Sequence, residues 1–300
     1  MTQSEQGALV GDALDGLSQQ YSERMNGCEF GTTLRGGSLP RGRYLGYIAG
    51  MYPIVVGFNR ALIRSLAKVD HVRQHAFVRA LAQQLHEEQA HNQLWRGKLR
   101  AFGVDHERLY QTLLNYLGSF SDQQLREMTL GVLECLRHDL GAVSPGCFPD
   151  APFPEPVLAL YHHLRMTASE SGVPHWEHFA SQASIEYIIF NVVSTSIYPG
   201  VVGNPELDAG PETTIWWKEH ARQGGDGRRR TDEEKHLAIS RHALNRSDEA
   251  NATAPRIMAR ADDAMRLFAA TFMVHDIDKV SFSSIPYQIG GSSESRYCAA

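Results

Sequence analysis

Apolar residues recur at helical spacing along most of the chain, and this pattern predicts the architecture. The longest example runs from Asp70 to Arg96, where leucines follow the 3.6-residue period and no Gly or Pro intervenes. The same criterion predicts further helices at residues 8–25, 41–69, 106–117, 122–140, 155–169, 175–196, 212–222, from 231 or 232 onward, and 254–278. No segment shows the alternation that is typical of a strand, so the predicted fold class is all-α.

Clusters of Gly, Pro, Ser and Thr separate these helices. They predict loops at 27–40, 144–154 and 199–211, and Pro53 is expected to kink the helix over 41–69. The Gly- and Arg-rich run 224–230 interrupts the chain between two further helices. Because no shift in composition marks a second domain, we predict one helical domain over residues 1–280 and a C-terminal tail over 281–300.

The candidate chemistry lies on the predicted helix over 70–102. Glu88 and His91 are three residues apart, so their side chains project from one face into a small volume. A second Glu-x-x-His pair, Glu233 and His236, has the same spacing. Helical bundles use such pairs to hold iron or manganese with positions left for dioxygen. Glu87 is an alternative to Glu88, since Glu87 and His91 form an i, i+4 pair.

Two further residues extend this candidate metal site. Glu186 stands inside an otherwise apolar helical stretch, where an uncompensated charge is costly. It is therefore expected to be neutral, salt-bridged or bound to a cation. His220 ends the short helix before the Gly- and Arg-rich run and supplies a spare imidazole.

The order of these residues does not fit a ferritin-like bundle. That bundle needs a lone Glu on the helix before the first Glu-x-x-His pair. No Asp or Glu occurs between residues 31 and 69, so this ligand is missing. A scaffold in which His220 replaces the missing carboxylate fits better.

At this point the sequence resembles the haem-oxygenase-like diiron oxidases and oxygenases, which share the TenA/PqqC-like helical scaffold. The resemblance covers about residues 40–245 and rests on four features: the apolar helix 43–56, the segment 87–105, Glu186 in its apolar helix, and Trp216-Trp217-Lys218-Glu219-His220. It implies a haem-oxygenase-like multi-helix bundle. The connection between Gly103 and His175 is longer than is usual in the family, which implies an extra helical elaboration.

The resemblance also implies a ligand set for two Fe(II) ions with dioxygen as co-substrate. It assigns Glu88, His91 and His220 to one iron, and Glu186 with the remainder of the third ligand segment to the other. The family pattern His-x-x-x-Asp-x-x-His places Gly224 and Gly227 where ligands are expected. If the Gly- and Arg-rich run is a nine-residue insertion, Glu233 and His236 take those places.

The activity implied by the resemblance is that of a non-haem diiron oxygenase. We expect it to oxidise a small amino-acid-derived substrate, by N-oxygenation or oxidative carbon–carbon cleavage, in natural-product or metallophore biosynthesis. The alternatives are a metal-free or haem-binding member of the same scaffold, or a fatty-acid-type oxidative decarboxylase. Cys135 could correspond to the nucleophile of the related thiamin-degrading enzymes, but nothing in the sequence pairs with it.

Charge and composition limit the classes of partner that this protein is expected to bind. The formal charge of −5 gives no reason to expect nucleic acid, and no apolar run approaches the roughly 18 to 20 residues that cross a bilayer. We therefore expect a cytoplasmic enzyme with a small-molecule substrate, and a homodimer stays open. The cations Arg60, Arg64 and Lys68 share one helical row, and either they or Arg228–Arg230 could pair with a substrate carboxylate. This interpretation predicts a carboxylic acid as substrate.

Overall fold

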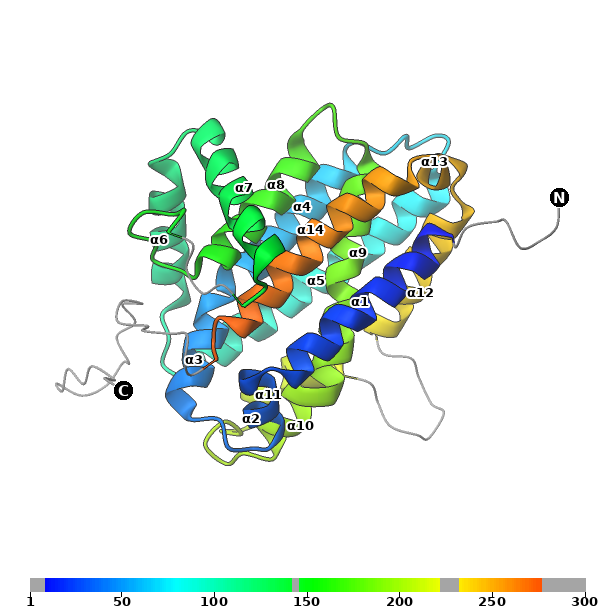
Figure 1. Cartoon of the computed structure of the whole chain (residues 1–300). Helices are drawn as coiled ribbons and strands as arrows, with labels where there is room; N and C mark the ends of the chain where they lie inside the picture. The colour runs from blue at the N-terminus through cyan, green and yellow to red at the C-terminus, as the bar shows by residue number, and fades with distance from the viewer. Residues whose placement is uncertain (1–8, 142–145, 222–231, 277–300) are drawn as a thin grey trace, which may run out of the picture.

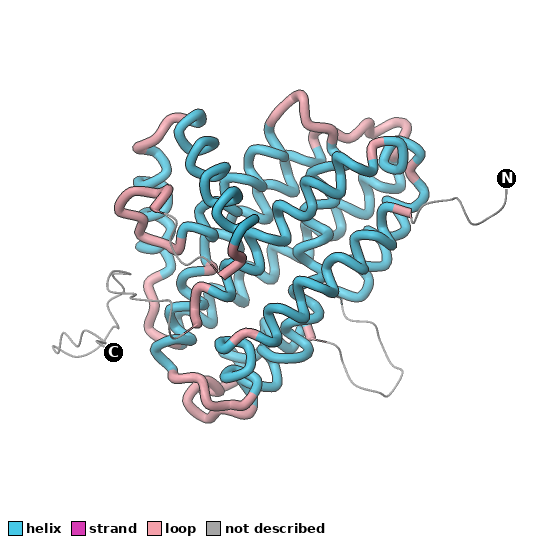
Figure 2. The backbone as a smooth tube through the Cα atoms, in the orientation of Figure 1, coloured by secondary structure: helices cyan, strands magenta, loops and turns pink. Residues whose placement is uncertain are grey.

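A computed structural model describes residues 9–141, 146–221 and 232–276, and every regular element in these ranges is a helix (Figures 1 and 2). In chain order the elements are α1 (Val10–Gly27), α2 (Glu29–Arg35), α3 (Arg41–Gly50), α4 (Tyr52–Leu66), α5 (His75–Ala101), α6 (His106–Gly118), α7 (Asp122–His138), α8 (Glu155–Ser169), α9 (His175–Val192), η1 (Val193–Ile197), α10 (Tyr198–Val202), α11 (Pro211–His220), α12 (Asp232–Arg246), α13 (Asp248–Ala252) and α14 (Ala254–Met273). The all-α prediction is confirmed.

Helix α9 forms the centre of the bundle. It contacts α1, α4, α8, α12 and α14, and nearly all of its side chains are buried. Because it is apolar on every side, it has no solvent face to present. The continuous helical stretch His175–Val202 is long and apolar enough to cross a membrane, but 61% of the most apolar part is buried inside the bundle. That burial is typical of the core helix of a soluble protein.

The long connection between α5 and α9 folds into three helices, as predicted. Helices α6 and α7 lie at one side of the bundle, where α6 packs on α4 and α5, and α7 packs on α8 and α14 (Figure 1). Local signals define the first turns: the Asp105 side chain caps α6, and Ser121 and Gln124 form a reciprocal capping box at α7. The predicted helical elaboration is therefore present.

Two predicted loops contain short helices instead. Helix α2 occupies part of 27–40 and α10 part of 199–211. Glycine allows a close backbone approach in both: a Cβ on Gly200 would lie 1.9 Å from the carbonyl oxygen of Leu34 in a distant segment, and one on Gly31 would lie 2.2 Å from that of Met25 at the end of α1. The predicted helix over 41–69 is broken at Met51 into α3 and α4, with Pro53 in the first turn of α4. The predicted tail 281–300 lies outside the described residues.

Three histidines of α8 and α9 are buried as neutral groups away from the candidate site. His162 and His178 share hydrogen bonds with the hydroxyls of Thr129 and Thr167, at 2.9 and 2.8 Å. Burial lowers the pKa of His162 from 6.5 to about 4, and the pKa of His163 and of His178 to about 3. These residues are core histidines.

We expect these histidines to destabilise the fold in acid. Their folded-state pKa values are lowered, so the unfolded chain binds more protons between about pH 6.5 and pH 4. The free energy of unfolding should fall across this window, by at most about 1.4 kcal/mol per pH unit for each histidine. Urea unfolding at pH 7, 6 and 5 measures this slope.

The variant His163→Gln should show a shallower dependence on pH than the wild type. His138→Gln is the matched control, because the side chain of His138 is 80% exposed. If the free energy of unfolding of His163→Gln depends on pH as steeply as that of the wild type, His163 does not contribute to the loss of stability in acid.

Candidate metal centre

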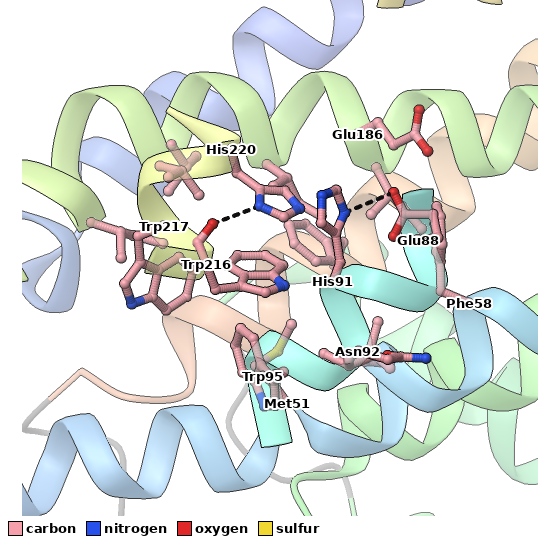
Figure 3. A pocket seen from close by; sticks show the side chains of 18 of the residues that line it. Met51, Phe58, Glu88, His91, Asn92, Trp95, Glu186, Trp216, Trp217 and His220 are labelled. Carbon is pink, nitrogen blue, oxygen red and sulfur yellow. Dashed lines mark hydrogen bonds and ion pairs between the residues drawn. The ribbon is translucent and has the colours of Figure 1, made fainter. Parts of the chain in front are cut away.

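Helices α5, α9, α11 and α12 bring five of the six predicted ligands to one region of the bundle. Glu88 and His91 come from α5, Glu186 from the middle of α9, His220 from the end of α11 and His236 from α12. Figure 3 shows four of them around one cavity. The side chain of the sixth, Glu233, lies outside the described residues.

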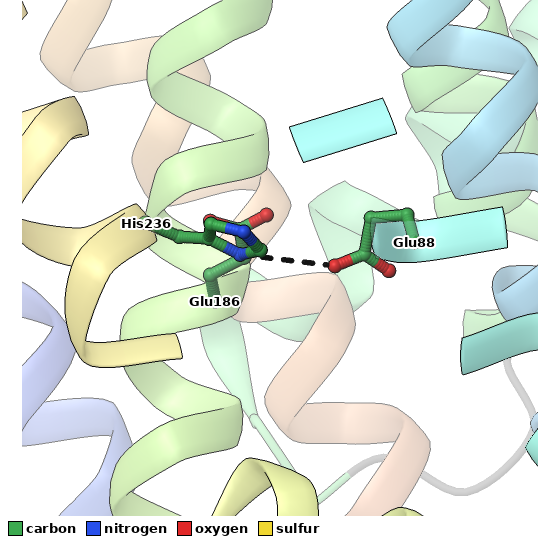
Figure 4. Close-up of side chains that lie close together, drawn as sticks. All are labelled: Glu88, Glu186 and His236. Carbon is green, nitrogen blue, oxygen red and sulfur yellow. Dashed lines mark ion pairs between the residues drawn. The ribbon is translucent and has the colours of Figure 1, made fainter. Parts of the chain in front are cut away.

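Three of these residues form a compact group of possible ligands. Glu88, Glu186 and His236 each offer one ligand atom, and the three atoms lie within 4.8 Å of one another (Figure 4). Glu186 is 2% exposed and His236 3% exposed, and 12% of the Glu88 side chain is exposed. A single cation between the three atoms would compensate both carboxylates.

Glu88 also faces a second pair of ligands. Its Oε1 lies 3.3 Å from Nδ1 of His91, and the rings of His91 and His220 are 4.3 Å apart between centroids. The resemblance assigned Glu88 to one iron with His91 and His220. The same oxygen, Oε1, lies 4.0 Å from Nδ1 of His236, so Glu88 borders both sets of predicted ligands.

Glu87 and Glu88 differ in their contacts with His236. Nε2 of His236 donates to Oε2 of Glu87 at 2.5 Å, because a carboxylate only accepts. This bond leaves the lone pair on Nδ1, which lies 4.0 Å from Oε1 of Glu88 and has no hydrogen-bond partner among the described residues. Glu87 therefore orients His236 from outside, while Glu88 faces the ligand group.

His220 is oriented in the same way by the backbone. Its Nδ1 donates to the carbonyl oxygen of Trp216 at 2.7 Å, so Nε2 carries the lone pair. The indole of Trp216 stacks on the imidazole with 3.6 Å between ring centroids. This arrangement fixes both the tautomer and the plane of the ring.

The ionisation of the group suits a divalent metal. Burial acts to raise the pKa of Glu88, but the hydrogen bond and charge of His91 and the charges of His220 and His236 outweigh it and lower that pKa. Burial and the neighbouring His91 hold the pKa of His220 well below its ordinary value. An ionised carboxylate and a neutral imidazole are the forms that bind metal.

Sequence reasoning missed two supporting amides. The side-chain amide of Gln84 donates to Oε1 of Glu186, and Nδ2 of Asn59 donates to the backbone carbonyl of Glu88 at 3.1 Å. The position of Gln84, one helical turn before Glu88, was a usable signal. Asn59 gave no such signal, because it lies on α4 and its contact with Glu88 on α5 depends on how the two helices pack.

A cavity of about 60 Å³ adjoins the ligands. Its charged or imidazole-bearing lining residues are Glu88, His91, Glu186 and His220, and most other lining residues are apolar. Among the described lining residues there is no Lys or Arg. Of the predicted carboxylate anchors, Arg60, Arg64 and Lys68 do not line this cavity, and Lys68 instead donates to three backbone carbonyls around the end of α8. The other predicted anchors, Arg228–Arg230, lie outside the described residues.

A buried lysine supports the tryptophan wall of this cavity. Lys98 is fully buried, and its Nζ lies 3.5 Å from the ring centroid of Trp217, 4.3 Å from that of Trp95 and 4.9 Å from that of Trp216. Burial holds the pKa of Lys98 well below its ordinary value. The aliphatic stem and amine thus fill the space behind Trp216, the residue that orients His220.

The described cysteines take no part in this site. Cys28, Cys135 and Cys147 are free thiols, and none of them lines the cavity. Cys298 lies outside the described residues. A cysteine nucleophile at this cavity is therefore not found in the described part of the chain.

Comparison with known proteins shows the fold. No protein-family profile and no curated protein sequence matches the chain. Its fold is similar to a TenA homologue from Pseudomonas syringae pv. tomato, with a TM-score of 0.57, 16% identity, and 87% of this chain and 91% of that chain covered. A TenA homologue from P. horikoshii gives a TM-score of 0.53 and 13% identity, with 89% and 98% covered. The chain therefore has the predicted haem-oxygenase-like helical fold.

We expect Glu186→Gln to weaken Mn(II) and Fe(II) binding strongly, because it removes a buried anionic ligand. Glu87→Gln should lower metal affinity by about 10- to 100-fold, since it disturbs only the orientation of His236. Anaerobic titration calorimetry measures both effects. Glu127→Gln, an exposed change on α7, is the control and should bind as the wild type does. Wild-type affinity in Glu186→Gln would exclude Glu186 as a ligand.

Proposed function

We propose that the protein is a non-haem diiron oxygenase that uses dioxygen to oxidise a small amino-acid-derived substrate. The observation that carries this proposal is the grouping of Glu88, Glu186 and His236 next to an apolar cavity. Glu88 and Glu186 line that cavity together with His91 and His220. N-oxygenation and oxidative carbon–carbon cleavage are the reactions we favour. The sequence-based expectation of a cytoplasmic location is part of the proposal.

The donor atoms fit two ferrous ions. Carboxylate oxygens and imidazole nitrogens without thiolate suit iron or manganese, and thiolate-rich sites suit zinc or copper(I). Glu88, Glu186 and His236 would surround one position, and Glu88, His91 and His220 the neighbouring one. Bound ferrous iron would supply electrons for the reduction of dioxygen, which no side chain in this cavity can do.

The protein's own contribution is orientation and exclusion of water. Glu87, Gln84 and the Trp216 carbonyl hold three of the ligands in place before any metal binds. The apolar walls would keep bulk water from the oxidising centre and contact the apolar part of the substrate. Preorganised ligands with open positions are what metal-assisted oxidation requires.

The cavity also offers donors for a polar substrate group. Nε1 of Trp216 and Nε1 of Trp95 are buried, belong to lining residues and have no hydrogen-bond partner among the described residues. Asn92 lines the same cavity and adds an amide. A carboxylate or amide oxygen of an amino-acid derivative could accept from these groups without a pairing cation.

The competing functions fit the cavity less well. A haem needs one axial imidazole, which would leave the grouping of Glu88, Glu186 and His236 without a role. A thiamin-degrading activity would need a cysteine beside the substrate, and none of the described cysteines lines the cavity. These observations favour metal-dependent oxidation on this scaffold.

We expect anaerobically Fe(II)-loaded protein to consume dioxygen and form ferric iron on exposure to air. His91→Gln and His220→Gln should lose at least about 90% of the initial rate, since each removes a ligand beside Glu88. An oxygen electrode and stopped-flow absorbance follow the reaction, circular dichroism checks the fold, and Glu127→Gln is the control. Wild-type oxygen uptake in His220→Gln would contradict the assigned role of His220.

A further inference from the structure

A second cavity lies on another face of α4. It has a volume of about 300 Å³ and lies among α4, α6 and α8, and it shares no lining residue with the cavity at the metal centre. Three arginines line it: Arg60 and Arg64 from α4 and Arg165 from α8. Arg60 and Arg64, two of the cations that the sequence suggested as a substrate anchor, therefore line this second cavity and not the one at the metal centre.

The arginines are only partly neutralised. Arg165 pairs with Asp122 at 2.9 Å, and Asp122 is the only carboxylate among the described lining residues. Arg64 donates to the hydroxyl of Ser169 at 2.8 Å, and Arg60 donates to the hydroxyl of Tyr110. Two of the three guanidinium groups thus have neutral hydrogen-bond partners in the described structure, and the cavity has an excess of positive charge.

The remaining lining is apolar and closely packed. Leu114, Leu117 and Phe120 contribute aliphatic and aromatic surface, and Tyr161, which is 6% exposed, lies against α4. A Cβ on Gly57 would lie 2.6 Å from the Tyr161 ring, so this glycine lets the ring approach the helix backbone. Charged groups and an apolar wall therefore face one space.

We propose that this cavity binds a small organic oxyanion, a phosphate monoester or a carboxylate, with an apolar body. The planar forks of Arg60 and Arg64 suit bidentate contact with phosphate or carboxylate oxygens. The apolar body would lie against Leu114, Leu117 and Phe120. The site is separate from the proposed oxidation and does not depend on it.

Titration calorimetry at low salt with phenyl phosphate, phenylacetate and inorganic phosphate tests this proposal. At least one aromatic anion should bind, and phenyl phosphate should bind more tightly than inorganic phosphate because of its apolar contacts. Whichever of phenyl phosphate and phenylacetate binds more tightly shows whether the site prefers a phosphate or a carboxylate group. Absence of binding by all three probes would overturn the proposal, as would equal affinity for phenyl and inorganic phosphate.

The double variant Arg60→Gln/Arg64→Gln should lower the affinity at least about tenfold, as expected when two charge-assisted contacts are lost. Arg73→Gln is the matched control, since this arginine is 88% exposed and pairs only with Asp70 in the described structure. Arg165→Gln provides a second test on a different helix. Thermal unfolding verifies that each variant is folded. Unchanged affinity in both the double variant and Arg165→Gln would also overturn the proposal.

Discussion

The burial of two carboxylates in the middle of a helical bundle is the constraint on which this site depends. Glu186 is 2% exposed on the most apolar helix of the chain, and Glu88 faces it from α5. Removing such charges from water is costly unless they are compensated. Glu177 on the same helix shows the ordinary solution, since Arg256 and Arg260 pair with it at 2.6 and 3.4 Å. Around Glu186 lie a glutamine amide, a second carboxylate and an imidazole, and the two carboxylates and the imidazole offer ligand atoms that a cation could bind.

The surrounding contacts maintain this arrangement. Glu87 directs His236, the Trp216 carbonyl directs His220, and Trp216 itself rests on the buried Lys98. With the bond from Gln84 to Glu186, three of the predicted ligands have their orientation set by a group that lies outside the ligand set. This separation between ligands and supports is typical of metal centres whose geometry exists before the metal arrives.

Periodicity was enough to predict the helices around the site, because α5 to α9 are bounded by capping residues, Gly and Pro that act locally. It failed for α2 and α10, which lie in stretches rich in Gly, Ser, Thr or Pro and which meet where Gly200 approaches the backbone of Leu34. Spacing singled out Glu88, His91 and His236, and the isolated charge singled out Glu186, and the structure brings these four residues to one region. Glu87 and Glu88 could not be separated, since both suit pairing with His91 on a helix, and only the position of α12 distinguishes them. The direction of the Arg60 and Arg64 side chains likewise depends on how α6 and α8 pack against α4.

Anomalous X-ray diffraction at the iron absorption edge, on crystals of protein loaded anaerobically with Fe(II), tests the central claim most directly. Two peaks are predicted on either side of the Glu88 carboxylate, one in contact with Glu186 and His236 and the other in contact with His91 and His220. Peaks confined to the protein surface, or no peak in a fully loaded and folded protein, would contradict the account.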